Sequence, residues 1–552
     1  MKKSLALLLT VCLMLVSCAA MAEEPLVPEL TRLTLATDGN ASTGDPSNLW
    51  FWEYCRRELN IDFDVTVTLD NDQFVSLAFA SDSIPDIMLC RLSTADIVRY
   101  GQEEGMLLDL SPYFTEEYMP NFTALLKEHP EWLSSLATKD GKVYSMPRIT
   151  GTETITGINI TGVKGNFMIN QKWLEETGLK SPTTLDELHE LLTAFKKLYP
   201  DCIPLGGGYS ALGEYNTVIS PGYLILNALG YTGTDVYGFE VSLRDGKVTI
   251  PFGDREVFGE YLKLMNQYYS ENLIAKDYFT LDATAVNASL AEGKIGVFPS
   301  SVGSGLKEGS NFTDYWGGQP LISAYKSEPS WGLMSNGLRI GQCSVSAECK
   351  NIKAAVAWID WFYNADSTHA LLSWAGPSAD QTELLYGMTD GYDFDLSTGS
   401  RVYRGVKNGK WQLVGELVQG EVAGFTERFG YMVNKSYAGY ALSGNEDQYV
   451  ELVYSAENAT QPWQWALYSI QENLMPYLVV DYPSIVFFSE EENTALADLR
   501  VSLESYATQE IAKFINGTRP VTDEELVDYF DTLDSMGYQE YLGYYQDYYE
   551  QM

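Results

Sequence analysis

The stretch Asn166–Lys197, NFMINQKWLEETGLKSPTTLDELHELLTAFKK, decides how the chain folds. Its apolar start, Phe167–Asn170, predicts a short buried strand. Gln171–Gly178 predicts a helical turn, because it ends at a glycine that can take the left-handed conformation of a helix C-terminus. Pro182 then prevents that helix from continuing. The stretch therefore opens with a strand and a short helix, followed by a sharp stop.

A second helix begins at Thr184, where the sequence predicts a capping box. The Thr184 hydroxyl is expected to accept a hydrogen bond from the Glu187 amide while the Glu187 side chain reaches back. Apolar residues then recur at helical spacing and predict one buried stripe, formed by Leu188, Leu191, Leu192 and Phe195.

The same alternation of strand and helix occurs nearer the N-terminus. Leu33–Thr37 and Asp62–Leu69 alternate in polarity as strands do, and a helical segment separates them. Strand–helix–strand units predict an α/β fold with a mostly parallel sheet. Ligands bind such sheets at the carboxyl ends of the strands, so the loops 38–50 and 81–93 are candidate edges of a ligand cleft. Asp82 is a candidate ligand-binding residue in the second loop.

The composition restricts the possible partners. The chain has 552 residues, too many for a single core. Its 36 Lys and Arg against 75 Asp and Glu give a net charge of −39, which repels nucleic acid and anionic membranes and argues against both as partners. The 37 Tyr and 12 Trp exceed what a core needs, and aromatic faces suit ligand clefts.

Met1–Ala22 is predicted to be an export signal, with two early lysines and the apolar run Leu5–Val16. The run is too short to span a membrane as a stable helix. Two cleavage sites fit. Leu15–Cys18 has the form of a lipobox, whose Cys18 would become a lipidated N-terminus, whereas Ala20–Ala22 fits ordinary signal peptidase. The protein is thus expected to be exported and to work outside the cytoplasm.

The sequence shows no recognisable pattern of a metal site or of a catalytic site. The histidines His129, His189 and His369 are scattered, and the patterns GxSxG, HExxH and Walker A are absent. The cysteines lack metal-site spacing; Cys343 and Cys349 either pair across a turn or are buried thiols. We therefore expect no enzyme, no metal site and no cofactor.

A structural calcium site is the alternative. Gly387–Val402 is predicted to form a hairpin with its turn at 397–399, and Asp390, Asp393 and Asp395 could bind structural calcium there. Their spacing does not match an EF-hand loop.

Several segments, in the same order, resemble the family 1 type of bacterial extracellular solute-binding proteins, which feed ABC transporters. Asn166–Lys197 is similar to the family's YxNKxxLxxxGLxxPxTWxELxxxxxxFK segment. The stretch 73–87 resembles LxLMLASGDLPDI, with Asp82-Ser83 where Gly-Asp is common. Segments 105–114, 140–147, 290–298 and 349–363 resemble further family motifs, and 483–552 resembles the C-terminal part of the larger, LipO-like lipoproteins.

The resemblance implies a periplasmic-binding-protein-like (type II) α/β fold, with two lobes of mixed sheets, flanking helices and a hinged cleft. The first lobe is expected at approximately 30–150 with 290–340. The second is expected at approximately 151–289 with 341–552, including a helical C-terminal extension.

The resemblance also implies the function: capture of a carbohydrate, in particular an oligosaccharide, for an ABC importer. The expected partners are the permease subunits of that importer, and the protein is expected to be a monomer. Because binding proteins of this family are commonly anchored at the cell surface, the resemblance favours lipidation of Cys18. A peptide or other amphipathic solute is the alternative ligand, and a surface lectin without transport is a third reading.

Sugar rings stack on aromatic faces, and their hydroxyls need polar partners. Candidate ligand-binding residues are therefore aromatic side chains in loops, each of which could instead be packing: Trp316, Trp331, Trp374, Tyr209 and Tyr215. In this family the segment near Arg148 approaches the hinge, so Arg148 and Glu153 are further candidates. Arg148 could equally be a residue that pairs with a carboxylate.

Overall fold

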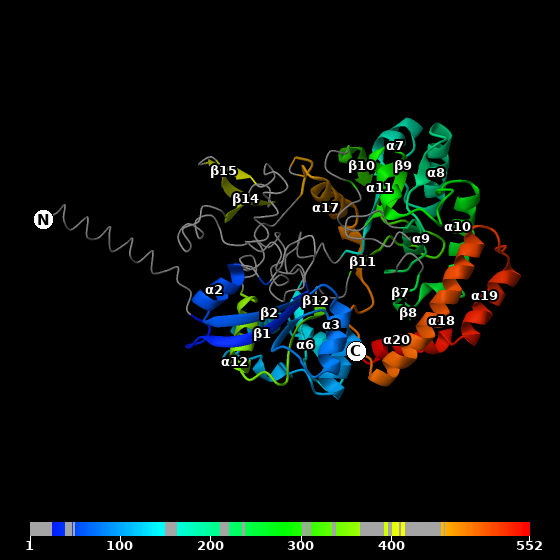
Figure 1. The fold of residues 1–552 in the computed structure, drawn as a ribbon. Helices are drawn as coiled ribbons and strands as arrows, with labels where there is room; N and C mark the ends of the chain where they lie inside the picture. Colours follow the sequence, from blue (N-terminus) through cyan, green and yellow to red (C-terminus); the bar gives the residue numbers. More distant parts are fainter. Residues whose placement is uncertain are drawn as a thin grey trace. The chain divides into compact units, whose positions relative to one another are not determined.

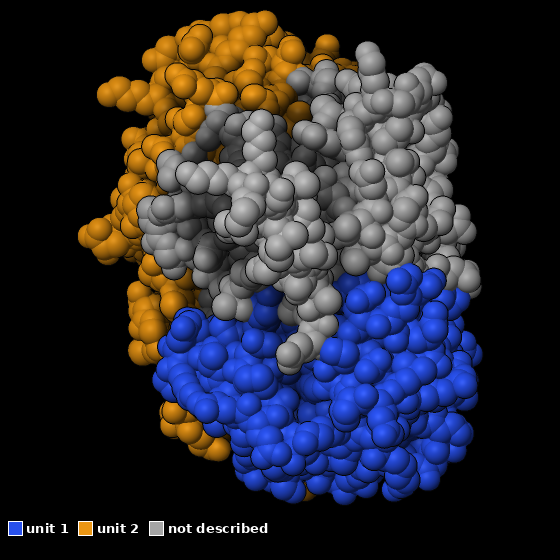
Figure 2. Space-filling view, turned by 90° about the vertical axis from the view of Figure 1, so that its left-hand side faces the viewer, with its two compact units in different colours: residues 1–152, 338–450 blue, residues 153–337, 451–552 orange. Residues whose placement is uncertain are grey.

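The computed structural model describes residues 25–38, 47, 50–149, 163–209, 220–233, 238–300, 306, 311–333, 338–364, 391–395, 400–407, 410–413, 454–457 and 459–552 (Figure 1). Five predictions fall outside the described residues: the export signal with Cys18, the candidate ligand residues Glu153, Tyr215 and Trp374, and Asp390 of the candidate calcium site. The chain divides into two compact units, residues 1–152 with 338–450 (unit 1) and residues 153–337 with 451–552 (unit 2), coloured separately in Figure 2.

Unit 1 contains a five-stranded mixed sheet of order β2-β1-β3-β12-β4. Its strands are β1 (Thr31–Asp38), β2 (Ile61–Thr68), β3 (Ile87–Leu89), β4 (Met146–Ile149) and β12 (Leu338–Val345). β1 pairs in parallel with β2 and β3, as the strand–helix–strand pattern predicts. β12 is antiparallel to both β3 and β4, so the sheet is mixed.

The helices of unit 1 are α2 (Trp50–Glu58), α3 (Asn71–Ala80), α4 (Thr94–Asp96), α5 (Pro120–Glu128), α6 (Glu131–Leu136) and α12 (Ile352–Trp361), with a π-helix at Ile97–Glu103. Trp361 is 3% exposed and its ring contacts that of Phe51, so it belongs to the core of this unit.

Asp82 lies in the turn that ends α3. It has φ 52°, in the left-handed region where glycine is the usual residue. The amide of Asp82 donates to Phe79 O (3.2 Å) and that of Ser83 donates to Ala78 O (2.9 Å), which is the Schellman pattern. Glycine, which is common at this point of the family segment that 73–87 resembles, would take this conformation without strain. Asp82 itself is exposed.

Unit 2 is built on a four-stranded sheet of order β10-β5-β9-β6. Its strands are β5 (Asn166–Asn170), β6 (Ile203–Leu205), β9 (Ile295–Ser300) and β10 (Tyr315–Gly317). Two small additions are the hairpin β7 (Ser242–Arg244) with β8 (Lys247–Thr249), and the parallel pair β11 (Trp331–Leu333) with β16 (Leu478–Val480).

The helices of unit 2 are α7 (Gln171–Thr177), α8 (Leu185–Leu198), α9 (Gly222–Ala228), α10 (Phe258–Ser270), α11 (Ala283–Ala291), α17 (Pro462–Asn473), α18 (Glu490–Ile515), α19 (Asp523–Ser535) and α20 (Tyr538–Glu550). The C-terminal helices α18, α19 and α20 pack on one another and on α10 and β8 (Figure 1).

The stretch 166–197 folds as predicted, with one correction. α7 ends at Gly178, which has φ 71°, and Thr184 caps α8 by accepting from the Glu187 amide at 3.1 Å. The Glu187 carboxylate, however, accepts from the amide and hydroxyl of Thr183, both at 2.8 Å, rather than from Thr184. The expected stripe is buried: Leu188, Leu191, Leu192 and Phe195 are each 0% exposed.

The predicted lobe boundaries are partly wrong. The first change of unit lies at 152/153, close to the expected 150/151, but the chain returns to unit 1 at 337/338 instead of near 290. Residues 290–337 stay in unit 2 because β9 and β10 both pair with β5. Residues 341–450 belong to unit 1 instead of unit 2, since β12 pairs with β3 and β4, whereas residues 451–552 lie in unit 2 as expected.

Three further predictions concern the hairpin, the two cysteines, and membrane-spanning or metal-binding segments. The hairpin is confirmed, since β13 (Gly391–Asp395) pairs antiparallel with β14 (Ser400–Lys407), and β15 (Lys410–Leu413) extends it. Cys343 and Cys349 are separate buried thiols. Among the described residues, no helix is long and apolar enough to cross a membrane, and no three metal-ligating side chains gather.

Candidate functional site

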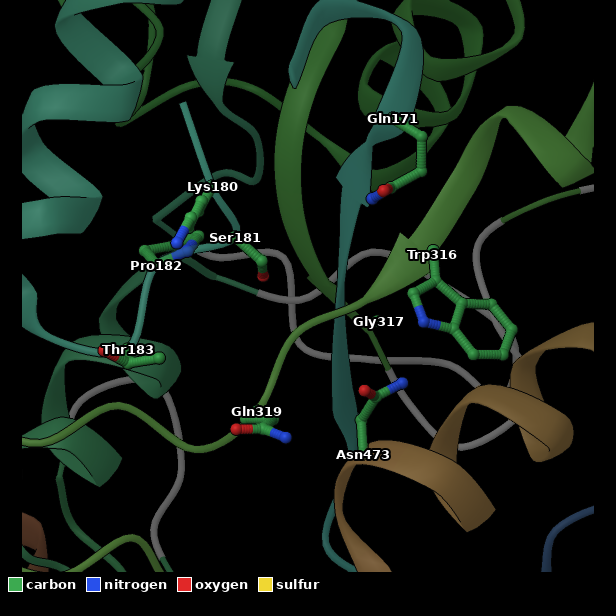
Figure 3. Close-up of a pocket in the computed structure, with 9 residues that line it drawn as sticks. All are labelled: Gln171, Lys180, Ser181, Pro182, Thr183, Trp316, Gly317, Gln319 and Asn473. Carbon is green, nitrogen blue, oxygen red and sulfur yellow. The ribbon is translucent and has the colours of Figure 1, made fainter. Parts of the chain in front are cut away.

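A pocket of about 320 Å³ in unit 2 holds one of the predicted ligand residues, Trp316. The other described lining residues come from the start of α7, the loop after α7, the end of β10 with the segment that follows it, and the end of α17: Gln171, Lys180, Ser181, Pro182, Thr183, Gly317, Gln319 and Asn473. Figure 3 shows the loop 180–183 facing Trp316 and Asn473 across the pocket, with the Gln171 amide directed between them.

The loop 180–183 is held from both ends. Gly178 allows the sharp turn after α7, and Pro182 keeps the chain out of a helix. The Thr183 carbonyl accepts from Ile322 N at 2.9 Å, while the bonds from Thr183 to the Glu187 carboxylate lower the pKa of Glu187. This wall of the pocket is therefore pre-formed.

Trp316 is half-buried on β10, with aromatic neighbours from α17. Its ring centroid lies 5.2 Å from that of Trp465 and 4.8 Å from that of Tyr468, at interplanar angles of 66° and 65°. Such edge-to-face contacts fix the orientation of an aromatic ring. The ring is held in place but keeps exposed surface, as a stacking platform needs.

The lining is mostly uncharged. Gln171, Gln319 and Asn473 supply amides, and Ser181 and Thr183 supply hydroxyls. Lys180 is the single ionisable side chain in the described part of the lining. Among the described residues no carboxylate lines this pocket, although the chain carries 75 Asp and Glu. An aromatic face among neutral donors and acceptors is suited to a sugar, with its C–H faces and hydroxyls.

Two of the other aromatic candidates are packing residues, so their assignment as ligand platforms is wrong. Trp331 is 0% exposed, and its indole Nε1 donates to Lys164 O (2.9 Å) and Gly165 O (3.1 Å). Tyr209 is 7% exposed, and its hydroxyl donates to Thr508 O at 2.6 Å. Both polar groups already have backbone partners, and neither ring has a face left for a ligand.

The two charged candidates among the described residues, Arg148 and Asp82, lie in unit 1, whereas the pocket lies in unit 2. Arg148 is half-buried on β4, opposite Arg339 of β12, and Asp82 is exposed at the end of α3. Their roles in binding stay predictions. Among the described candidates, the pocket contains Trp316 alone.

Sequence reasoning missed most of the lining residues. Gln171, Gln319 and Asn473 are isolated amides without a motif, and Asn473 lies 157 positions beyond Trp316 in the numbering. The sequence did indicate a restricted connection at 180–183, because a proline stop there is followed by a capped helix. The sequence does not indicate which side chains this loop faces, because that depends on the pairing of β10 with β5.

The family comparison agrees with these features. Residues 41–369 match the family model described as bacterial extracellular solute-binding protein. The chain belongs to this family. Members of an extracellular family are exported, and the two-unit α/β architecture with mixed sheets is the fold expected of its type II periplasmic-binding members.

Two curated relatives are similar to the chain. The chain is 24% identical over 542 residues to the fructooligosaccharide ABC transporter substrate-binding protein FusA of Streptococcus pneumoniae, covering 96% of this chain and 91% of FusA. It is also 24% identical over 343 residues to lipoprotein LipO of Bacillus subtilis, covering 59% of this chain and 62% of LipO.

Solved structures show the same fold. FusA of S. pneumoniae in complex with kestose superposes with a TM-score of 0.65 at 22% identity, covering 94% of this chain and 99% of FusA. An extracellular solute-binding protein from Bifidobacterium longum subsp. infantis gives a TM-score of 0.68 at 20% identity, covering 96% of this chain and 98% of that one. The predicted fold class is thereby confirmed.

Proposed function

We propose that this protein captures an oligosaccharide outside the cytoplasm and delivers it to the permease of an ABC importer, with the Trp316 pocket as a binding surface for the sugar. The observation that carries this proposal is the pocket itself: one oriented indole ring faces amides and hydroxyls, and the lining residues that the structure describes include no carboxylate. Such a surface can stack on one face of a sugar ring and bond its hydroxyls.

The family and its members support the proposal. FusA, which is similar over nearly the whole length of the chain, is named for fructooligosaccharides, and its solved complex contains kestose. The chain is also similar to YtcQ of Bacillus subtilis, a polygalacturonan/rhamnogalacturonan-binding protein, at 23% identity over 241 residues. The shared property of these ligands is that they are carbohydrates.

The proposal includes the remaining parts of the transport function. The protein acts as a monomer, uses no cofactor and catalyses no reaction. It is held at the membrane by lipid on Cys18. Mass spectrometry of the N-terminal peptide tests the anchor, because cleavage after Ala22 would produce an unmodified N-terminus at Glu23.

A thermal-shift screen tests the ligand class. The purified protein is heated alone and with kestose, maltotriose, xylotriose, trigalacturonate or a peptide pool. A ligand at a hundredfold its Kd adds about 2.7 kcal/mol of stability, which raises the melting temperature measurably. A shift with one glycan supports the proposal and identifies its class. A shift with peptides and with no glycan contradicts it in favour of the peptide alternative.

The pocket is tested separately. For the glycan that raises the melting temperature, Trp316→Ala is expected to raise Kd about tenfold or more, since loss of one aromatic stacking contact removes roughly 1–2 kcal/mol. Binding within twofold of wild type would show that the sugar binds elsewhere on the protein.

A further inference from the structure

The orientation of Trp316 depends on α17, which lies outside the residues matched by the family model. That model ends at residue 369, whereas α17 spans Pro462–Asn473. α17 packs directly against β10, the strand that carries Trp316, and β10 is the edge strand of its sheet. A segment distant in sequence thus occupies the free side of the strand that presents the ring.

Two hydrogen bonds tie α17 to β10, one on each side of Trp316. The Trp465 indole Nε1 donates to the carbonyl of Tyr315 at 2.6 Å. The amide of Gly317 donates to the hydroxyl of Ser469 at 2.9 Å, and Ser469 is 1% exposed. Because the residues before and after Trp316 are both fixed, the direction of its side chain from the strand is fixed as well.

Gly317 makes this arrangement possible. A Cβ atom at position 317 would lie 2.0 Å from the Ser469 Oγ, a distance that no side chain can tolerate. Only glycine lets the strand approach the helix closely enough for the bond to Ser469. The close approach also brings the rings of Trp465 and Tyr468 against Trp316.

The helix is itself anchored at its start. The Gln464 side-chain oxygen accepts from the amides of Thr460 and Gln461, both at 3.0 Å, and Gln464 is 1% exposed. At the other end, Asn473 donates from Nδ2 to Ser469 O at 3.0 Å, which leaves its amide oxygen as an acceptor in the pocket lining. α17 is therefore a rigid support.

We propose that α17 completes the ligand site: Ser469 and Trp465 are positioning residues that set the Trp316 platform, and Asn473 contacts the sugar. This rests on the proposed function, because it assumes that Trp316 is the platform. It assigns part of the binding specificity to the C-terminal segment of the chain, beyond the region on which family membership is recognised.

The test measures the environment of the Trp316 ring by fluorine NMR. The full-length protein is labelled with 5-fluorotryptophan, and the Trp316 resonance is assigned from the Trp316→Phe variant. Ser469→Ala removes the acceptor for Gly317 N–H, and Trp465→Phe removes the indole donor while keeping an aromatic ring. Each is expected to move or broaden the Trp316 resonance in the ligand-free protein. Glu472→Ala, an exposed position on the same helix, is the matched control and should leave it unchanged.

Binding is then measured by calorimetry with a mixture of kestose, maltotriose, xylotriose and trigalacturonate. Ser469→Ala and Trp465→Phe should each weaken binding about fivefold, and Asn473→Ala about fivefold without moving the Trp316 resonance. Glu472→Ala should bind as wild type.

The outcomes separate this inference from the proposed function. If Trp316→Ala weakens binding but the Ser469 and Trp465 variants leave both the resonance and Kd unchanged, the inference is wrong and the proposed function stands. If the wild-type Trp316 resonance does not respond to the sugar mixture, both fail. Should Ser469→Ala not fold, Trp465→Phe alone decides, since it leaves the buried amide of Gly317 bonded.

Discussion

The Asp360 carboxylate on α12 accepts a 2.8 Å hydrogen bond from the backbone amide of Phe122, 238 positions earlier in the chain. It also accepts from the amide of Asn121 at 3.0 Å. Both amides belong to the first turn of α5, which begins at Pro120 without a side-chain cap of its own. Asp360 therefore caps a helix that is remote in sequence.

The free energy of unfolding should depend on pH because Asp360 gains or loses a proton. Burial raises the pKa of Asp360 to about 6, from 3.8, with the two amide bonds acting in the opposite direction. Between pH 4 and 6 the folded protein holds a proton that the unfolded chain has released. The stability that Asp360 contributes is thus present below pH 4 and lost as the pH rises through 6, by roughly 2–3 kcal/mol.

Urea unfolding of wild type and Asp360→Asn at pH 4, 5, 6 and 7 measures this effect. Relative to the variant, the wild-type free energy of unfolding should fall as the pH rises. A constant difference across the series would mean that Asp360 does not titrate in this range.

Trp331 and Trp316 should respond differently to the same substitution. Trp331 is fully buried between Phe167 and Tyr223, so Trp331→Ala should cost about 3–5 kcal/mol of stability through the cavity that it creates. Trp316→Ala should lower sugar affinity with a smaller effect on stability. Thermal unfolding and calorimetry on both variants check the contrast, which fails if both variants lose stability equally.

Lys164 and Asp481 form a buried ion pair that should matter for stability. Their Nζ and Oδ2 atoms lie 2.6 Å apart, and the side chains are 25% and 0% exposed. Asp481→Ala leaves Lys164 without this partner and should cost about 3 kcal/mol. The double variant Lys164→Met/Asp481→Leu should recover much of the loss, because it removes both charges.

The surface pair Arg32–Asp64 is the control for this prediction. Its atoms lie 3.1 Å apart, but the side chains are 69% and 60% exposed. Asp64→Asn should change stability by about 1 kcal/mol or less. An equal loss from Asp64→Asn and Asp481→Ala would contradict the role given to burial.

Because of Lys326, the free energy of unfolding should increase as the pH rises above 7. It is 7% exposed, and its Nζ donates to Asn227 O, Asn227 Oδ1 and Ser330 O at 3.1, 3.0 and 2.7 Å. Burial lowers the pKa of Lys326 to about 7. Above pH 7 the unfolded chain carries a proton that the folded protein lacks, so stability rises with pH by about 1.4 kcal/mol per unit until near pH 10.

Unfolding of wild type and Lys326→Met at pH 7, 8 and 9 tests this expectation. The wild type should gain stability relative to the variant at each step. Parallel curves would show that Lys326 keeps its ordinary pKa in the folded protein.

The local parts of the fold could be predicted from the sequence. The strand, the glycine stop and the capped helix of 166–197 depend on neighbours within a few positions, and all three are present. The cap by Asp360 depends on a partner 238 positions away, and no local pattern indicates it. The same difference explains the wrong lobe boundaries, since the strands at 295–300 and 338–345 find distant partners.

The site was predicted less well for the same reason. Trp331 has the loop-like neighbours Pro329, Ser330 and Gly332, but it lies on a short strand whose partner, β16, begins at Leu478. Trp316 has equally loop-like neighbours in Gly317 and Gly318 and remains at a pocket. What distinguishes the two rings is the element packed over each, which the surrounding sequence does not reveal.

The position of β12 has a consequence for the order in which the protein forms. β12 lies between β3 and β4 in the sheet of unit 1, yet it begins at Leu338, 189 positions after the end of β4 and 249 after the end of β3. Until that segment has been synthesised, β3 and β4 each have an open edge that can pair with other chains. Unit 1 therefore cannot mature as an N-terminal domain during synthesis. A chain cut before residue 338 should aggregate, and an exported chain needs protection from misassembly until β12 has arrived.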